Sequence, residues 1–308
     1  MQTRFTFRQL EYLVAVGQEG SIIAAAEKVN VSSPSISAAI SQLESELGVQ
    51  IFVRQHAQGL SLTPGGQRIF YEAKQILASA AALTDTANDI TETARGPITI
   101  GCLVTMAPFV SAAIRRSFET EHPDTTVNLR EANQEDLLAM LGRAEIDFAI
   151  TYDLDIPNDI SFEGLVSLPP YVILAKDHPL SHRTSISLAE IADDPMVLLD
   201  LPLSRDYFLG IFSRLGLRAN VAERSSDLAV TRSLVANGFG YSLINIRPKT
   251  NFAPDGAELV FLPLEGDHRP MIVGLASKKS VHTSRIMVAF ESHIRSLVDK
   301  GALPGLAR

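Results

Sequence analysis

Residues 20–48 read GSIIAAAEKVNVSSPSISAAISQLESELG, and this stretch predicts two short helices joined by a tight turn. Ser21 is suited to cap the first helix, and Asn30 tolerates the left-handed backbone that closes a turn. The second helix would begin after Ser32 or Ser33. Apolar residues recur at helical spacing in both segments, and two amphipathic helices around a turn predict a helix-turn-helix.

The exposed face of the second predicted helix carries small polar side chains, which let a helix approach another surface closely. Serine can bond many base edges and alanine can touch a thymine methyl, so this face suits the DNA major groove. An ordinary helical hairpin with a serine-rich solvent face would show the same pattern. If the hairpin binds DNA, we expect contacts from Ser21, Ser33, Pro34, Ser35, Ser37, Ala38 and Gln42, and from Arg54 in the segment that follows.

The flanking segments predict the rest of a winged helix-turn-helix. Residues 5–17 have the apolar spacing of a first helix, and residues 50–54 and 60–63 alternate like the two strands of a small wing. His56, at the tip of the wing, could reach phosphates, although a solvated loop fits this segment as well. The prediction for residues 1–64 is an all-α winged helix-turn-helix domain.

Residues 65–95 predict a long helix that follows the turn at residues 63–66. The apolar spacing alternates between four and three, as in a coiled coil, although a single helix packed on its own domain would also be apolar on one side. Gly96-Pro97 then ends the pattern abruptly. We therefore predict a linker helix that pairs two chains through Ile69, Ala73, Ile76, Ala80, Leu83, Ala87 and Ile90.

From Pro97 onward, predicted strands alternate with predicted helices, which is typical of parallel α/β sheets. The strands are predicted at 98–103, 126–130, 148–151, 171–175, 197–199, 220–223, 241–244 and 271–276. The helices are predicted at 107–121, 133–141, 205–215, 227–237 and 284–298. A segment of this length could form one domain or two lobes.

The composition of the 308-residue chain is that of a globular protein, with a net charge of −8. No apolar run approaches the roughly 20 residues of a membrane span, and the N-terminus lacks the apolar core of a signal peptide. We therefore expect a cytoplasmic protein with no membrane partner. Cys102 is the single cysteine, and inside a predicted strand it fits a buried side chain better than a redox sensor.

The charge of the N-terminal segment argues against strong DNA binding. Residues 1–66 hold four arginines and lysines against five glutamates, so the basic patch of a strong DNA binder is missing. Small polar groups and helix N-termini can also hold phosphates. We therefore expect weak binding by each module, which two linked copies would overcome.

Motifs for catalysis are missing from the sequence. It has no Gly-x-Ser-x-Gly elbow, no Gly-x-x-x-x-Gly-Lys phosphate loop and no Cys-x-x-Cys pair. His178 and His182 have helical spacing, but Pro179 lies between them and no further ligand is near. We predict no catalytic residues, no metal and no cofactor.

Small polar residues recur where predicted strands end and predicted helices begin. Tyr152 ends a strand, and we expect Asn133, Ser204 and either Ser225 or Ser226 to cap the helices that follow them. Ligands of open α/β sheets bind at such strand ends, where helix N-termini offer free N–H groups. Each residue could be only a helix cap, but together they predict a shared ligand cleft.

The cleft as predicted contains neutral donors and no placed lysine or arginine. Thr105 precedes a helix with Pro108 in its first turn, so the N–H groups of Met106 and Ala107 should be free to bind an anion. One carboxylate with an apolar or aromatic body fits such a lining better than a phosphate or a dicarboxylate. Thr105 could instead be only a helix cap. The predicted effector-binding residues are Thr105, Met106, Asn133, Tyr152, Leu203, Ser204, Phe208 and Ser225.

The N-terminal motifs also resemble a known family. The chain is similar to the DNA-binding domain of LysR-type transcriptional regulators at residues 7–10, 24–26, 31–37, 43–48, 51–54 and 62–66. It departs from the family at two contact positions, because LysR-type proteins often carry glutamine at Ser33 and arginine at Ala38. The organisation of the remaining chain fits the same family.

This resemblance implies a fold and a mechanism. Residues 96–308 would form a two-lobed α/β effector-binding domain of periplasmic-binding-protein type, with lobe I at 97–167 and 269–300 and lobe II at 168–268. The chains would form homodimers or homotetramers, assembled as dimers of dimers, on double-stranded DNA. A small molecule between the lobes would change the angle between the bound DNA segments.

We therefore predict a DNA-binding transcriptional regulator, modulated by a small organic acid, that is not an enzyme. The first alternative is a cytoplasmic small-molecule-binding protein that uses its N-terminal module only for assembly. The missing basic charge favours this alternative and the serine-rich helix face opposes it. The second alternative is an α/β enzyme, which the lack of a nucleophile or metal constellation argues against.

Overall fold

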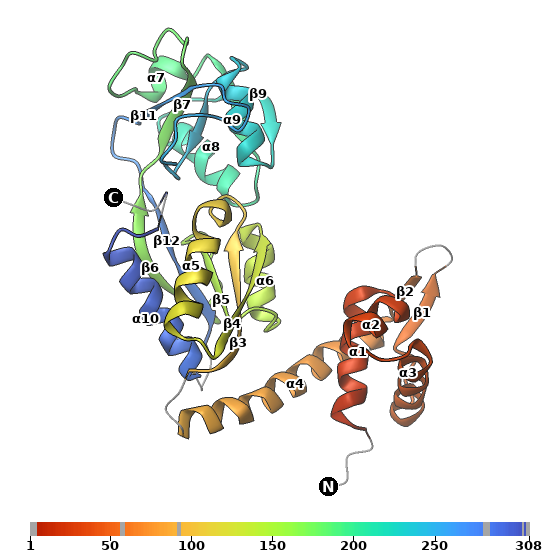
Figure 1. Ribbon diagram of the computed structural model, residues 1–308. Coiled ribbons are helices and arrows are strands. Elements are labelled where there is room, and N and C mark those ends of the chain that lie inside the picture. Colours follow the sequence, from red (N-terminus) through yellow and green to blue (C-terminus); the bar gives the residue numbers. More distant parts are fainter. Residues whose placement is uncertain (1–4, 56–58, 91–93, 280–283, 304, 306–308) are drawn as a thin grey trace. The chain divides into compact units, whose positions relative to one another are not determined.

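The computed structural model describes residues 5–55, 59–90, 94–279, 284–303 and 305 (Figure 1). The chain divides into two compact units, Met1–Thr91 and Glu92–Arg308. Among the described residues, no helix is both long enough and apolar enough to cross a membrane.

The N-terminal unit is a winged helix-turn-helix continued by a long helix (Figure 1). Helices α1 (Phe7–Glu19), α2 (Ile22–Lys28) and α3 (Ser33–Leu47) precede an antiparallel wing of β1 (Phe52–Gln55) and β2 (Gly59–Leu62), and α4 (Pro64–Ile90) follows. The three short helices share one apolar core, so the position of α3 is fixed by its buried side. The residues of α3 that reach this core are Ile36, Ile40 and Leu43.

Local sequence explains where these helices begin. Ser21 caps α2 and Ser32 caps α3, and each hydroxyl accepts a backbone N–H three residues further on. Of the two serines considered for the second cap, Ser33 is therefore the first helical residue. Asn30 has a φ of 54°, which confirms the predicted left-handed turn between α2 and α3.

The two halves of α4 have different surroundings. Ala73 is buried in the N-terminal core, where α4 contacts α1. Further along the helix, Ile76 is 37% exposed and Leu83 is 74% exposed. The side chains of Ala87 and Ile90 lie outside the described part of the structure. The beginning of the predicted heptad pattern, at Ala73, thus packs within its own chain. Ile76 and Leu83, in the middle of the pattern, expose apolar side chains to solvent.

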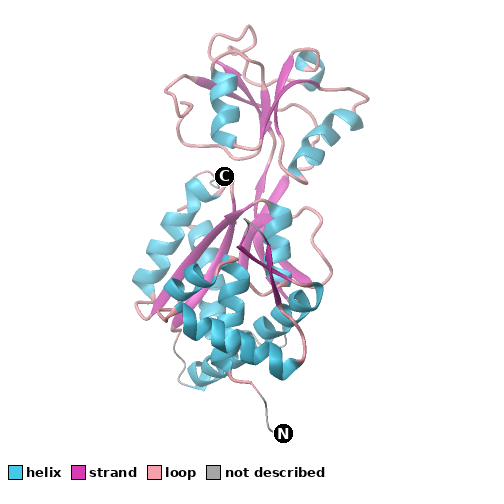
Figure 2. Ribbon diagram, turned by 90° about the vertical axis from the view of Figure 1, so that its right-hand side faces the viewer, coloured by secondary structure: helices cyan, strands magenta, loops and turns pink. Residues whose placement is uncertain are grey.

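The described part of the C-terminal unit contains three sheets, of five, three and two strands (Figures 1 and 2). The first has the order β4-β3-β5-β12-β6 and is packed with helices α5 (Ala107–Glu121), α6 (Gln134–Gly142) and α10 (Arg285–Asp299). We refer to this part as lobe I. Its strands are β3 (Gly96–Leu103), β4 (Thr125–Ala132), β5 (Phe148–Tyr152), β6 (Ile160–Leu168) and β12 (Met271–Lys278).

Lobe II is built on the sheet β10-β7-β11 and on a parallel pair, β8 with β9. The chain passes between the lobes twice, once from β6 to β7 and once from β11 to β12 (Figure 1). The elements of lobe II are β7 (Tyr171–Ala175), α7 (Leu188–Ile191), β8 (Pro195–Leu199), α8 (Ser204–Arg214), β9 (Asn220–Ser225), α9 (Leu228–Ala236), β10 (Ser242–Ile244) and β11 (Leu259–Pro263).

The sheets are not all parallel, which corrects the prediction of parallel sheets: the five-stranded sheet is mixed, β10-β7-β11 is antiparallel, and β8 with β9 is parallel. β3 pairs in parallel with β4 and β5, but β12 is antiparallel to β5 and β6, and β7 is antiparallel to β10 and β11. In lobe I, β12 is antiparallel to β6 because the chain leaves the lobe through β6 and returns to it through β12. The predicted elements also lack β6, β11 and α7. β6 is an edge strand whose polar and apolar positions alternate irregularly.

Candidate functional site

Helix α3 turns its small polar side chains away from the core of the N-terminal unit. Ile36 and Leu43 are fully buried on its inner side. Ser33 is half-buried, and the exposed positions on the remaining surface are Pro34, Ser35, Ser37, Ala38, Ser41 and Gln42. The fold therefore places the predicted DNA-contacting residues of this helix on one accessible surface.

Some of these side chains are already engaged within the helix. Ser35 Oγ lies 2.7 Å from Ser32 Oγ, and Gln42 Nε2 donates to Glu46 Oε1 at 3.0 Å. Among the described residues, the hydroxyl of Ser37 has no hydrogen-bond partner. Ser37 is thus open to a new contact, as is Ser41, which is exposed and also has no hydrogen-bond partner among the described residues.

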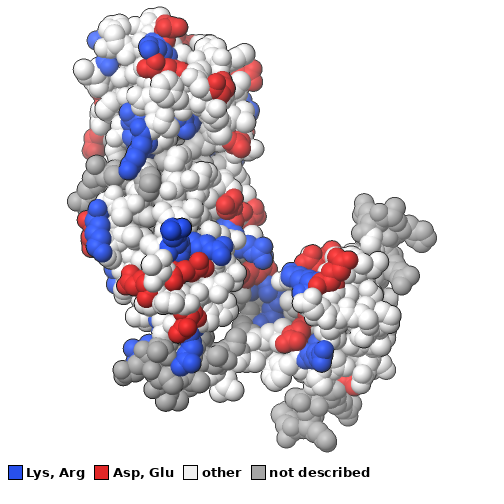
Figure 3. Space-filling view, in the orientation of Figure 1, with Lys and Arg blue, Asp and Glu red and all other residues white. Residues whose placement is uncertain are grey.

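The other two predicted DNA contacts lie outside α3. Ser21 is half-buried as the cap of α2, while Arg54 lies in β1 and its side chain is outside the described residues, as is His56. In Figure 3, basic groups on the N-terminal unit are scattered and lie beside acidic ones. Lys28, for example, contacts Glu19 at 2.6 Å. The described surface carries no continuous basic patch in this view.

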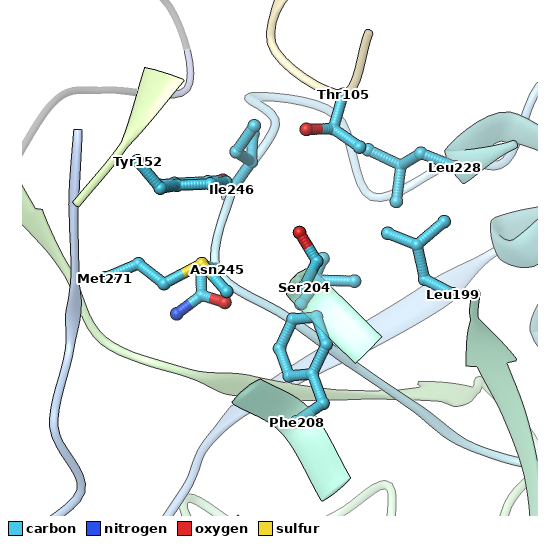
Figure 4. Close-up of a pocket in the computed structure, with 10 residues that line it drawn as sticks. Thr105, Tyr152, Leu199, Ser204, Phe208, Leu228, Asn245, Ile246 and Met271 are labelled. Atoms are coloured by element: carbon cyan, nitrogen blue, oxygen red, sulfur yellow. The ribbon is translucent and has the colours of Figure 1, made fainter. Parts of the chain in front are cut away.

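A small cavity lies between lobe I and lobe II (Figure 4). The hydroxyls of Thr105 and Ser204 point into it, from the segment after β3 and from the start of α8. The space open to water-sized molecules is about 20 Å³, which is room for about one water. The residues that line this inner cavity are Thr105, Tyr152, Leu199, Ser204, Phe208, Leu228, Ile244, Asn245, Ile246 and Met271.

The inner cavity contains polar groups that lack partners. Thr105 is 6% exposed, and its Oγ1 forms no hydrogen bond with any described residue. Burial raises the pKa of the Tyr152 phenol, and the Thr105 hydroxyl beside it offsets part of this rise. Asn245 Nδ2 donates to the Leu168 carbonyl at 2.9 Å, whereas Asn245 Oδ1 has no partner. Unpaired buried polar groups cost about 1–3 kcal/mol each, so these groups favour a polar ligand.

A larger, open groove continues from the inner cavity. The two share Thr105 and Leu228, and the groove has a volume of about 550 Å³. Asn133 lies on this groove and caps α6, with Oδ1 accepting the Asp136 N–H at 3.0 Å, which confirms the predicted cap. The other residues that line the outer groove are Val104, Pro108, Phe109, Leu201, Ser226, Asp227, Ala229, Arg232 and Pro254.

Two expectations about ligand contacts are wrong in detail. Met106 is fully buried and its N–H donates to the Leu103 carbonyl at 2.8 Å, so this N–H is not free to bind an anion. Leu203 is the residue before α8, with a φ of 65°, and it lines neither the inner cavity nor the outer groove. Ser204 is the first residue of α8 rather than its cap, and its N–H donates to the Pro202 carbonyl at 2.8 Å.

The cap of α9 is also different from the prediction. Asp227 caps this helix, and its carboxylate accepts the N–H groups of Ala229 and Val230. Ser225 ends β9, and its Oγ accepts the Asp227 N–H at 3.2 Å. Ser225 lines neither the inner cavity nor the outer groove, whereas Ser226 lines the groove. Asp227 is the cap because its carboxylate accepts two N–H groups of the first turn of α9, which have no partner within the helix.

Two polar residues of this region, Asn245 and Arg232, are not among the predicted effector-binding residues. Asn245 directly follows β10. Ligands of α/β sheets bind where strands end, and this expectation, which selects Tyr152, applies to Asn245 as well. Arg232 lies on the buried side of α9 with Thr231 and Val235. An arginine on the apolar side of a predicted helix is the signal that could have identified it.

Lobe I contains a Ser–His–Glu arrangement like that of a hydrolase. Ser117 Oγ lies 2.8 Å from His293 Nε2, and His293 Nδ1 lies 2.9 Å from Glu121 Oε2. Ser117 lies inside α5, and its hydroxyl also contacts the Ile114 carbonyl at 3.1 Å. The neighbouring N–H groups are used within the helix, so they cannot form an oxyanion hole. The arrangement therefore links α10 to α5. The described residues also contain no group of three or more His, Cys, Asp or Glu placed to hold a metal.

Cys102 is buried in β3, with 1% of its surface exposed. Burial raises the pKa of its thiol to about 12. The thiolate is the reactive form, and at pH 8 it would make up roughly one part in ten thousand. The structure thus agrees with Cys102 as a buried apolar side chain and opposes a role in redox sensing.

We expect Cys102 to resist alkylation in the folded protein. At pH 8 iodoacetamide should leave the native chain unmodified over an hour, whereas the chain unfolded in guanidinium chloride should gain one adduct by intact mass spectrometry. The reactivity of the native thiol should rise only as the pH approaches about 12, because the neutral thiol predominates below the raised pKa. Rapid modification of the native protein at pH 8 would contradict this account.

Comparisons with known proteins cover nearly the whole chain. The family model for a "LysR substrate binding domain" matches residues 91–299, and that for a "Bacterial regulatory helix-turn-helix protein, lysR family" matches residues 7–67. The HTH-type transcriptional regulator CysB of Haemophilus influenzae is 26% identical over 95% of this chain and 92% of its own length.

Solved structures give the same result. HinK, a LysR family transcriptional regulator from Pseudomonas aeruginosa, is 30% identical, with a TM-score of 0.65 over 96% of this chain and 99% of that one. A full-length OxyR variant from the same species is 25% identical, with a TM-score of 0.74 over 99% of this chain and 100% of that one.

Proposed function

The chain belongs to the LysR family of transcriptional regulators, and from this premise we propose that α3 reads DNA and that a small organic acid bound between the lobes modulates the activity. LysR regulators bind DNA and oligomerise, and the relatives of this chain are regulators rather than enzymes. A regulator of this kind acts on DNA in the cytoplasm.

The proposal divides the chain by role. Residues 1–64 bind DNA, residues 65–95 form the dimerising linker, and residues 96–308 bind the effector. Within the last segment, lobe I comprises residues 97–167 and 269–300, and lobe II comprises residues 168–268. The exposed apolar side chains of Ile76 and Leu83 support pairing of two α4 helices. Homodimers, or tetramers built as dimers of dimers, would then place several α3 helices on one operator.

The effector proposal rests on one observation, the buried and unpaired hydroxyl of Thr105 in a cavity lined by both lobes. A carboxylate oxygen can accept from this hydroxyl and from that of Ser204, and the leucines and Phe208 around them suit an apolar or aromatic body. The inner cavity alone is too small for such a molecule. The effector would therefore extend into the outer groove, or the lobes would separate to admit it.

The test is binding of organic acids to the full chain and to Thr105→Val. A thermal-shift screen of organic acids identifies a ligand, and calorimetry then measures its affinity. Thr105→Val keeps the shape of the side chain and removes the hydroxyl, so it should weaken binding by about 1–2 kcal/mol and leave folding nearly intact. Thr120→Val, on the exposed part of α5, is the matched control and should bind like the wild type. Unchanged affinity in Thr105→Val, or only neutral and cationic hits, would refute the proposal.

A further inference from the structure

Helix α9 contains a buried arginine that has no acidic partner among the described residues. Arg232 is 6% exposed and lines the outer groove that begins at Thr105. Its Nη2 donates to the carbonyl oxygen of Phe252 at 2.6 Å and lies 3.4 Å from that of Thr250. Its Nε is buried without a partner. A buried cation is thus compensated only by carbonyl dipoles, and two of its nitrogens, Nε and Nη1, bond to no described residue.

The charged groups near Arg232 do not supply the missing negative charge. Burial lowers the pKa of Arg232, and the positive charge of Arg247 lowers it further. Arg247 donates to Asn251 Oδ1 at 3.0 Å and stacks over the Phe261 ring. Asp227, the acidic residue on the same groove, is exposed and its carboxylate caps α9. The surroundings of Arg232 are therefore those of an anion site.

We propose that Arg232 is a specificity-determining residue of the effector site and binds an anionic group in the outer groove. The effector would then be a diacid, with one acidic group at Arg232 and the other at the hydroxyls of Thr105 and Ser204. The inference rests on the proposed function and refines it. The sequence favours a monocarboxylate only because no lysine or arginine is placed in the predicted cleft. Arg232 lines the outer groove, so a second acidic group of the ligand has a cation to bind.

The chemistry of the guanidinium supports this assignment. Arginine presents several N–H donors in one plane and binds carboxylates through two bonds at once, which lysine cannot reproduce. The attraction between opposite charges is also stronger in a partly buried groove than at the open surface. A ligand that contacts Thr105 of lobe I and Arg232 of lobe II would join the two lobes, so its binding would bias their separation.

The alternative is that Arg232 only ties residues 250–252 to α9, because its two contacts to carbonyl oxygens lie there. The two roles differ in their response to ligand. A structural arginine changes the melting temperature without ligand and leaves the shift produced by a diacid unaltered. An anion-binding arginine changes the affinity for diacids and leaves the affinity for monocarboxylates nearly unaltered.

The experiment is a thermal-shift titration of the full chain with dicarboxylates from malonate to adipate, against monocarboxylates of equal length and sodium chloride at matched ionic strength. At least one dicarboxylate should stabilise the wild type more than its monocarboxylate analogue does. Arg232→Met should lower the affinity for that dicarboxylate at least tenfold. Arg218→Met removes an exposed arginine of lobe II and should behave like the wild type.

Arg232→Lys covers the case in which Arg232→Met does not fold, because lysine retains the positive charge and the long side chain. It should fold and bind the dicarboxylate severalfold more weakly than the wild type. Full affinity in a folded Arg232 variant, or a wild type that prefers monocarboxylates, overturns the inference while a loss in Thr105→Val still supports the proposed function. A wild type that responds to no acid overturns both.

Discussion

A chain that carries both Ile76→Asp and Leu83→Asp is expected to have half the molecular mass of the wild-type protein in solution. If these side chains form the contact between two α4 helices, each substitution buries a carboxylate there. An unpaired buried ion costs several kcal/mol, which is enough to separate the helices. Ile76 and Leu83 are 37% and 74% exposed in the single chain, so its own fold does not need them. Light scattering after size-exclusion chromatography measures the mass, and circular dichroism shows that the variant is folded.

The control for this experiment is Gln67→Asp, which adds a carboxylate at an exposed position of α4 outside the heptad. It should keep the wild-type mass. The double variant should also lose most of its affinity for operator DNA, because residues 1–66 contain fewer basic than acidic residues and a single module would bind weakly. A double variant of full mass, or dissociation caused by Gln67→Asp, would contradict the assignment of the linker.

Local sequence signals account for most of the N-terminal unit. The caps at Ser21 and Ser32 and the turn at Asn30 follow from side-chain chemistry that acts over three or four residues. The heptad of α4 is predictable only in part. Its spacing does not reveal that Ala73 packs on its own domain whereas Leu83 lies free of it, because that division depends on where α1 lies.

The effector region is less predictable because its geometry depends on long-range contacts. The inner cavity is lined by Thr105 and Tyr152 of lobe I and by Ser204 and Phe208 of lobe II. Thr105, Tyr152 and Ser204 are predictable because ligands of α/β sheets bind where strands end and helices begin. Phe208 lies inside α8, and that expectation does not select it. The same expectation does not determine which group caps a helix, and Asp227 replaces the expected serine. Arg232 can be recognised as an arginine on the apolar side of a predicted helix, but its contacts with residues 250–252 depend on tertiary packing that hydrophobic spacing does not describe.

The second large effect is expected for Ser37→Arg in α3. Ser37 is exposed and its hydroxyl has no partner among the described residues, so an arginine can replace it without loss of a packing contact. Arginine binds O6 and N7 of guanine together, and such a pair discriminates between bases by about 1–3 kcal/mol. The variant should therefore acquire a preference for guanine at one position of each half-site, although the wild-type α3 has no arginine on its exposed surface.

The matched control is Ser45→Arg, which adds the same charge to an exposed position near the C-terminal end of α3. An arginine that contacts only phosphates should strengthen binding to all sequences alike and increase the salt dependence. Ser45→Arg is therefore expected to keep the wild-type sequence preference. The comparison separates base recognition by Ser37 from a general effect of positive charge.

Selection of binding sites from a random DNA library, carried out in parallel on the wild type, Ser37→Arg and Ser45→Arg, tests directly whether α3 reads the operator. We expect one shared consensus for the wild type and Ser45→Arg, and for Ser37→Arg a consensus with a new guanine at symmetric positions of the two half-sites. An unchanged consensus for Ser37→Arg, with only a uniform change in affinity, would show that α3 does not read the DNA sequence.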